Sequence, residues 1–166
     1  MRSNKTRTFY LRYSGDFDFQ GLYDYLCNFF VSRNYDLFET RWKEKEGSPE
    51  GREITVNMKP DKKINEYVKY VYKLEWKSVD AHPVQITQNG QKKQGMNARF
   101  HIIISADVQV DWQNLEKNRL MDKALAKLYN EYLFKREFDQ VYAGPLEEEI
   151  QQIMDGAKKI LHMELA

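Results

Sequence analysis

The residues of this chain that could carry out chemistry are few and widely spaced. Its three histidines, His82, His101 and His162, stand far apart, and none has a carboxylate or a second histidine at metal-ligand spacing. The sequence contains no glycine-rich phosphate loop, no GxSxG motif and no HExxH motif. We therefore expect a protein that is not an enzyme, with no cofactor and no metal, unless distant residues assemble a site.

Other reactive residue types have simpler structural interpretations. His101 falls on the polar side of a predicted strand, where we expect it exposed or partly covered. Cys27 lies beside the apolar stripe of a predicted helix, and we expect a buried, inert thiol. Asp107 and Asp111 lie on one strand face about 13 Å apart, too far for a paired acid–base site. We expect both carboxylates in solvent.

Lysine and tyrosine side chains share one face of another predicted strand, at Tyr67, Lys69, Lys73 and Lys77. Sheets with exposed aromatic and basic residues can bind single-stranded nucleic acid. However, acidic residues interleave with these lysines, and the formal net charge of the chain is only +1. The overall electrostatic footprint of a nucleic-acid-binding protein is missing, so the composition argues against a nucleic-acid partner.

The clearest element that could position such residues is the segment Arg99 to Trp112. Every even position of RFHIIISADVQVDW is apolar, and Ile103 alone interrupts the polar odd positions. This alternation predicts a half-buried strand. At ~3.3 Å per residue it would be about 45 Å long, so it needs partner strands and a cover for its apolar face.

A second long strand is predicted from Ile64 to Val79. Because proline cannot donate a hydrogen bond to a ladder, Pro83 predicts a bulge, bend or edge over 80–83. Asn89-Gly90 is a strong signal for a two-residue hairpin. The segment 64–112 is thus predicted to form a long antiparallel ribbon. Its tip, TQNGQKKQG, contains no apolar residue and is expected to project into solvent.

Shorter elements complete the prediction. Strands are expected over 6–13, ended by Ser14-Gly15, and over 34–46 and 52–59, followed by a turn at 59–63. A helix of about four turns should follow Asp16 or Asp18 as its N-cap, with Asn34 in a left-handed C-terminal position. After Trp112 the period becomes helical, and Gly144-Pro145 separates two further helices.

This order predicts an α+β fold: a twisted antiparallel sheet of about five strands with a long β-ribbon, one N-terminal amphipathic helix and two C-terminal helices packed on one face. Residues 1–166 are expected to form a single domain, with 145–164 as a helix that could separate and dock on a partner. The first ten residues lack the apolar core of a secretion signal, and no stretch is long enough to span a membrane. We expect a cytoplasmic or virion location.

Four segments together resemble an uncharacterised group of small α+β proteins from archaeal and environmental genomes. These segments are GREITV, YVKYVYKLEWK, NARFHIIISADVQVDW and LYNEYLFKREFD. The resemblance covers the chain from about Phe9 to its end and contains no catalytic signature. It implies a cytoplasmic or viral origin and no known activity.

The leading functional hypothesis is a non-enzymatic structural, assembly or protein-interaction subunit, with a virion or similar large particle as the candidate assembly. Its expected partner is a protein, through self-association or a larger assembly. The candidate contact residues are Asn89, Gly90, Lys92 and Lys93 at the ribbon tip, and Ile150, Ile153 and Ile160 on the last helix.

Two alternatives remain open. One is a carrier of a small apolar ligand, with a cavity like that of helix-grip folds. Its candidate lining residues are Tyr70, Tyr72, Trp76, Phe100 and Trp112. The other alternative is a single-stranded nucleic-acid binder.

Overall fold

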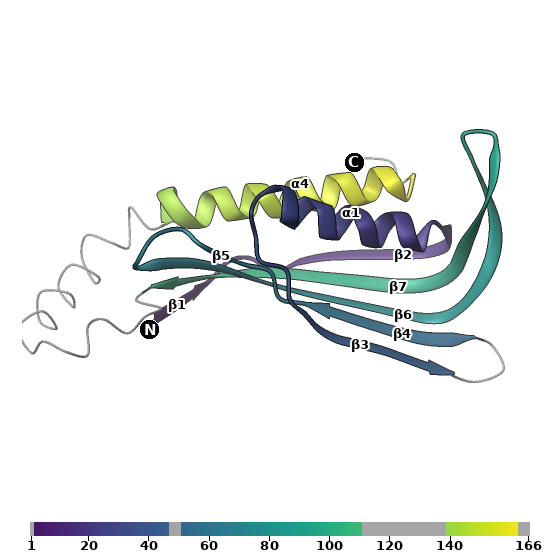
Figure 1. Ribbon diagram of the computed structural model, residues 1–166, viewed down its shortest axis with the longest axis horizontal. Coiled ribbons are helices and arrows are strands. Elements are labelled where there is room, and N and C mark those ends of the chain that lie inside the picture. Colours follow the sequence, from purple (N-terminus) through teal and green to yellow (C-terminus); the bar gives the residue numbers. More distant parts are fainter. Residues whose placement is uncertain (1, 47–50, 111–138, 163–166) are drawn as a thin grey trace, which may run out of the picture.

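The computed structural model describes residues 2–46, 51–110 and 139–162 of the 166-residue chain. The described strands form one antiparallel sheet, and both described helices lie on the same face of it (Figure 1). The strands are β1 (Arg2–Lys5), β2 (Phe9–Phe17), β3 (Glu39–Glu46), β4 (Arg52–Met58), β5 (Asp61–Lys63), β6 (Val68–Gln88) and β7 (Gln91–Val110). The helices are α1 (Phe19–Ser32) and α4 (Gly144–Ile160), and a short π-helical segment, η3 (Asp139–Ala143), leads into α4.

The predicted long ribbon is the centre of the sheet. β6 and β7 pair along nearly their whole length, from Val68 opposite Val110 to Gln88 opposite Gln91. Asn89 and Gly90 both have positive φ, 52° and 76°, which a tight hairpin of this kind requires. The register shifts between Val79 and His82, in agreement with the bulge, bend or edge predicted over 80–83.

The remaining strands add to both sides of this ribbon. The strand order is β1-β7-β6-β4-β3, with β2 also pairing with β7 and β5 also pairing with β6. Seven strands replace the five expected, because β1 and β5 are too short to produce a visible alternation. The first predicted strand does not end at Ser14-Gly15. Its inward row continues through Gly15 to Phe17, which is buried.

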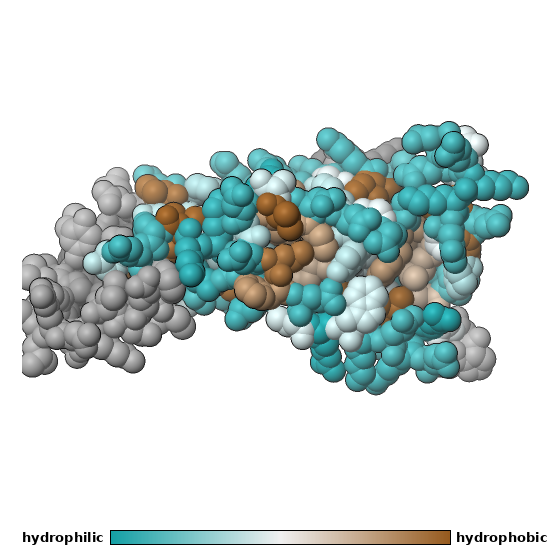
Figure 2. Space-filling view, viewed as in Figure 1, coloured by the Kyte–Doolittle hydropathy of each residue, from teal (hydrophilic) through white to brown (hydrophobic). Residues whose placement is uncertain are grey.

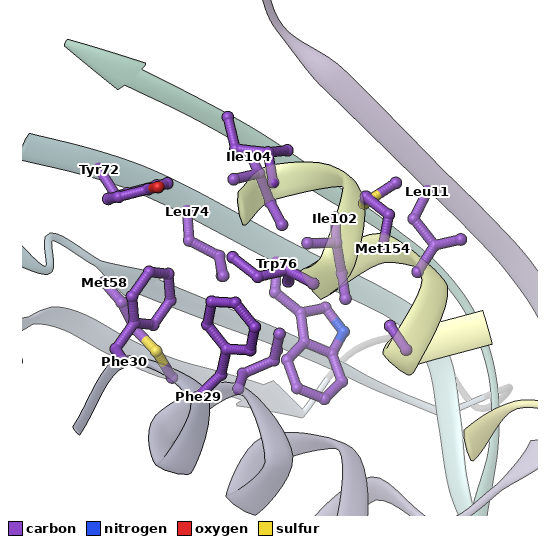
Figure 3. Close-up of a cluster of buried hydrophobic side chains, with 14 of the residues drawn as sticks. Leu11, Phe29, Phe30, Met58, Tyr72, Leu74, Trp76, Ile102, Ile104 and Met154 are labelled. Carbon is purple, nitrogen blue, oxygen red and sulfur yellow. The ribbon is translucent and has the colours of Figure 1, made fainter. Parts of the chain in front are cut away.

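The core lies between the sheet and the two helices (Figure 3). α1 begins at the predicted N-cap: the Asp18 carboxylate accepts a hydrogen bond of 3.0 Å from the Gly21 N–H. Asn34 follows the helix with φ 61°, as predicted. The first of the two predicted C-terminal helices falls mainly on residues outside the described part of the chain, as do Asp111 and Trp112.

The last helix packs within this molecule. Five of its side chains are buried, and they are Leu146, Ile150, Ile153, Met154 and Ala157. They face α1 and the sheet, and the Tyr25 hydroxyl of α1 donates hydrogen bonds to the carbonyls of Gln152 and Ile153 at 3.2 and 3.3 Å. In the described structure α4 is therefore an integral layer of the fold, rather than a free docking element.

Candidate functional site

The ribbon tip is exposed, as expected, but one of its lysines already has a partner. Asn89, Gly90 and Lys92 are exposed, while the Lys93 ammonium lies 2.6 Å from the Asp18 carboxylate at the start of α1. The ribbon arm, defined here as residues 84–94, curves towards the face that carries the helices (Figure 1). Lys93 therefore helps to attach this arm to the body of the protein.

The Asp18 carboxylate is nearly buried, and two opposing effects act on its pKa. Burial raises the pKa, whereas hydrogen bonds from the Lys93 ammonium and the Gly21 N–H lower it. The net result is a pKa below the ordinary value, because the charged form receives two donors. Asp18 is thus ionised at neutral pH and holds Lys93 close to it.

The candidate contact residues of the last helix are not on the surface. Ile150 and Ile153 have no exposed area, and the half-buried Ile160 packs against the same core. Their apolar stripe is covered by the sheet and α1 of this chain. In this fold Ile150 and Ile153 are therefore core residues and are not available to a partner.

The described candidates for a ligand cavity form part of the packed core. Tyr70, Tyr72, Trp76 and Phe100 are all buried. Trp76 and Phe100 lie with ring centroids 5.6 Å apart, and Tyr72 contacts the Phe30 ring at 5.1 Å. Interiors of this kind reach crystal-like packing density, so these four rings are explained by packing alone.

A buried polar cluster joins α4 to the sheet and to the segment after α1. The hydroxyls of Tyr35 and Tyr72 both donate to the same Glu149 oxygen, at 2.8 and 2.7 Å. Burial and the neighbouring Glu149 carboxylate raise the pKa of both phenols. Although Glu149 lies near the N-terminus of α4, its carboxylate turns towards these two core tyrosines.

Two of the other reactive residues behave differently from expectation. Cys27 is half-buried rather than buried, and burial raises the pKa of its thiol, the direction expected for an inert cysteine. Asp107 was expected in solvent, and this is wrong: the residue is only 7% exposed. Its nearest described cation is the Lys73 ammonium at 3.8 Å, and one carboxylate oxygen has no hydrogen-bond partner within the part of the chain that the structure describes.

The face of the sheet opposite the helices carries a row of polar side chains in register, three of which are positively charged. Cross-strand pairing places Arg12 opposite His101, His101 opposite Lys77, Lys77 opposite Thr55, and Thr55 opposite Lys43. We call these five residues the cationic row. They face away from the helices because their neighbours along each strand, among them Leu11, Ile102, Trp76 and Val56, are buried in the core.

A groove of about 730 Å³ lies on this open face, over β2, β7 and β6. Arg12, His101 and Lys77 of the cationic row line it, together with Tyr10 and Ile103 from the neighbouring row. Tyr10 is 62% exposed although it is a large aromatic residue. The groove thus combines positive side chains with an accessible ring.

The charges of this face are only partly neutralised. The Lys77 ammonium lies 3.1 Å from the Glu53 carboxylate, and Arg99 pairs with Asp80. Arg12 and Lys43 have no ion pair with any described residue. The pKa of Lys43 is lowered by the nearby positive charges of Lys45 and Arg41 on the same strand face.

The cationic row is not visible in the sequence because its five members come from five separate strands. Lys77 had been grouped with Lys69 and Lys73 along one strand, but each of these lysines has a carboxylate partner. The relevant neighbours of Lys77 lie across strands and become visible only with the register. The low net charge of the whole chain conceals this local concentration.

Neither protein-family models nor curated proteins show a match to this sequence. Within the described residues, no helix is long and apolar enough to cross a membrane. The same residues contain no cluster of three or more histidine, cysteine or acidic side chains suited to hold a metal ion.

Proposed function

We propose that this protein is a non-enzymatic binding subunit that holds an anionic partner on the open face of its sheet. The cationic row supports this proposal most directly. Arg12, Lys77 and Lys43 are its positively charged members, and Lys43 also lies beside Arg41 and Lys45 on the same strand face, where the like charges repel one another. A bound anion would relieve this repulsion, and the concentrated positive charge would attract it.

The surroundings of the row support binding at an exposed surface. The row spans β2, β7, β6, β4 and β3, so a partner could contact five strands at once. Hydrophilic side chains cover the ribbon arm and the β3–β4 edge, and hydrophobic ones appear between them (Figure 2). The row lies on an exposed surface, whereas catalytic groups usually combine burial with strongly shifted pKa values.

Self-association through the outer edge of β3 is disfavoured by the same charges. Arg41, Lys43 and Lys45 share the open face of this strand, because they alternate with Trp42 and Glu44. Antiparallel pairing of two copies about Lys43 would bring Arg41 opposite Lys45. Lysines on edge strands commonly block such pairing, so we propose an anionic partner in preference to a second copy at this edge.

The test is binding of a fluorescein-labelled heparin fragment, used as a general anionic probe. Wild-type protein should bind at low salt, and binding should weaken as salt increases. Replacing two members of the row, Arg12→Gln with Lys43→Gln, should weaken binding about tenfold.

The matched control removes two positive charges from the other face, through Lys158→Gln and Lys159→Gln at the end of α4. This control variant should bind nearly as well as wild type. An equal loss in both double variants would mean that only net charge matters, and the proposed site would then be wrong.

A further inference from the structure

We infer that the anionic partner is a segment of single-stranded nucleic acid whose backbone crosses the strands along the cationic row. This inference rests on the proposed function and names the chemistry of the partner. It combines three observations: the length of the row, the exposed ring beside it, and the arrangement of its charges.

The length of the row suits a short nucleic-acid segment. The five residues of the row lie on five adjacent strands, from Arg12 on β2 to Lys43 on β3. Four intervals of ~4.8 Å make a track about 19 Å long. Sheet-based single-strand binders contact as few as about four nucleotides per fold, which such a track can accommodate.

The exposed ring provides what a nucleic acid can use and an acidic peptide cannot. Tyr10 is paired with Ile103 in the row next to Arg12 and His101, and both Tyr10 and Ile103 line the groove. An accessible phenol ring stacks on the flat face of any base, with little dependence on sequence. The Arg12 guanidinium, two residues away on the same strand face, can contact the phosphate or stack on a base.

Phosphates of a nucleic-acid backbone can replace the carboxylates that pair with the cations of this face. Lys77 of the row is paired with Glu53, and Arg99, which lies outside the row but lines the same groove, is paired with Asp80; the side chains of both pairs are largely accessible. Exposed pairs of this kind contribute little, so phosphates can replace the carboxylates at small cost. With about three phosphate contacts, the logarithm of the binding constant should fall with the logarithm of salt concentration with a slope of about −2.

The experiment measures fluorescence polarisation of labelled 12-nucleotide single strands of RNA and DNA, with a 12-base-pair duplex and polyglutamate as alternatives. Single strands should bind more tightly than duplex or polyglutamate, with the salt dependence given above. Tyr10→Ala should weaken single-strand binding about tenfold, leave heparin binding unchanged, and be rescued by Tyr10→Phe. Tyr67→Ala is the matched control, because Tyr67 is 53% exposed and does not line the groove.

Each failure has a distinct meaning. If polyglutamate binds as tightly as the single strands, or if Tyr10→Ala changes nothing, the nucleic-acid inference is overturned, while row-dependent heparin binding still supports an anion-binding face. If the Arg12 and Lys43 variants leave heparin binding intact, the proposed function itself fails. The melting temperature of every variant is measured, so that unfolding is not mistaken for a loss of binding.

Discussion

Two polar atoms on β6 face the core without a hydrogen-bond partner among the described residues. They are the indole Nε1 of Trp76 and the hydroxyl of Ser78, two residues further along the same strand face. A buried polar group without a partner costs about 1–3 kcal/mol relative to one that is paired. In the described structure, these two polar groups therefore lower the free energy of unfolding relative to a core in which they were paired or replaced by apolar atoms.

Replacing Ser78 with alanine tests this cost at one residue. Ser78 has no exposed area. The substitution removes the side-chain oxygen and adds no heavy atom to the core. We expect Ser78→Ala to raise the free energy of unfolding by about 1 kcal/mol, measured by urea denaturation. A decrease of similar size would show that the hydroxyl has a favourable partner in solution.

The ion pair between Asp18 and Lys93 offers a second test at residue scale. Asp18→Asn preserves the N-cap of α1, because asparagine caps as well as aspartate, but removes the charge opposite Lys93. We expect a loss of about 1 kcal/mol at pH 7, and Asp18→Ala should lose about 1 kcal/mol more by removing the cap.

The pH dependence of this loss follows from the lowered pKa of Asp18. The unfolded carboxyl titrates near its ordinary value of 3.8, and the folded carboxyl titrates below it. Its stabilising contribution is therefore complete well above the unfolded pKa and disappears as the pH falls through the folded pKa. The difference between wild type and Asp18→Asn should shrink accordingly. A difference that stays constant down to the folded pKa would exclude the ion pair as its cause.

At the scale of elements, the contact between α1 and α4 depends on the absence of one side chain. A Cβ atom added at Gly156 would overlap the Tyr25 hydroxyl, which bonds to two carbonyls of α4. Glycine within a helix normally costs about 1 kcal/mol relative to alanine. Gly156 therefore lowers the helix propensity of α4 but allows the two helices to approach each other closely.

A double-mutant cycle separates these two effects. Gly156→Ala alone should lower the free energy of unfolding by about 1–2 kcal/mol, because Tyr25 must move and lose its hydrogen bonds. In a Tyr25→Leu background the same change should be neutral or stabilising by up to about 1 kcal/mol. Additive effects in urea denaturation would show that Tyr25 does not restrict position 156.

Local patterns predict the elements of this fold well. The inward rows of β4, β6 and β7, the caps at Asp18 and Asn34, and the Asn89-Gly90 turn all follow from residues close together in the sequence. Each is set by backbone geometry or by alternating burial, which a short window of sequence contains. The short strands β1 and β5 lack such a window and were missed.

The candidate site could not be predicted because it depends on register. Arg12 and Lys43 become members of one row only when β2 and β3 are placed on opposite sides of the β6–β7 ribbon. A shift of one residue in any strand would turn its contribution towards the core. The burial of Asp107 and the inward turn of Glu149 likewise arise from contacts between elements distant in sequence.

At the scale of the whole molecule, the described helices cover one face of the sheet, and the proposed binding surface lies on the opposite face. Both helices cover one face and enclose the aromatic core, so the other face is free to carry charges that do not help folding. This division explains how a nearly neutral chain can present a positive surface. It also predicts that Arg12→Gln and Lys43→Gln leave stability nearly unchanged, because both side chains are exposed.

The enclosed core also determines how the whole molecule responds to alkaline pH. Burial raises the pKa of several tyrosines, to about 12 for Tyr70 and further for Tyr72. Above about pH 10, tyrosines of the unfolded chain lose protons while these phenols in the folded chain keep theirs. The unfolded state then binds fewer protons, so stability falls by about 1.4 kcal/mol per pH unit for each such tyrosine.

Replacing single tyrosines resolves this response. Tyr72→Phe should make the alkaline decline in unfolding free energy shallower by the contribution of one proton, although at pH 7 it lowers stability because Glu149 loses one of its two donors. Tyr67→Phe, at an exposed position, is the matched control. Urea denaturation from pH 8 to pH 11, followed alongside tyrosinate absorbance, measures both slopes. If the two variants decline equally, the buried phenols do not control alkaline unfolding.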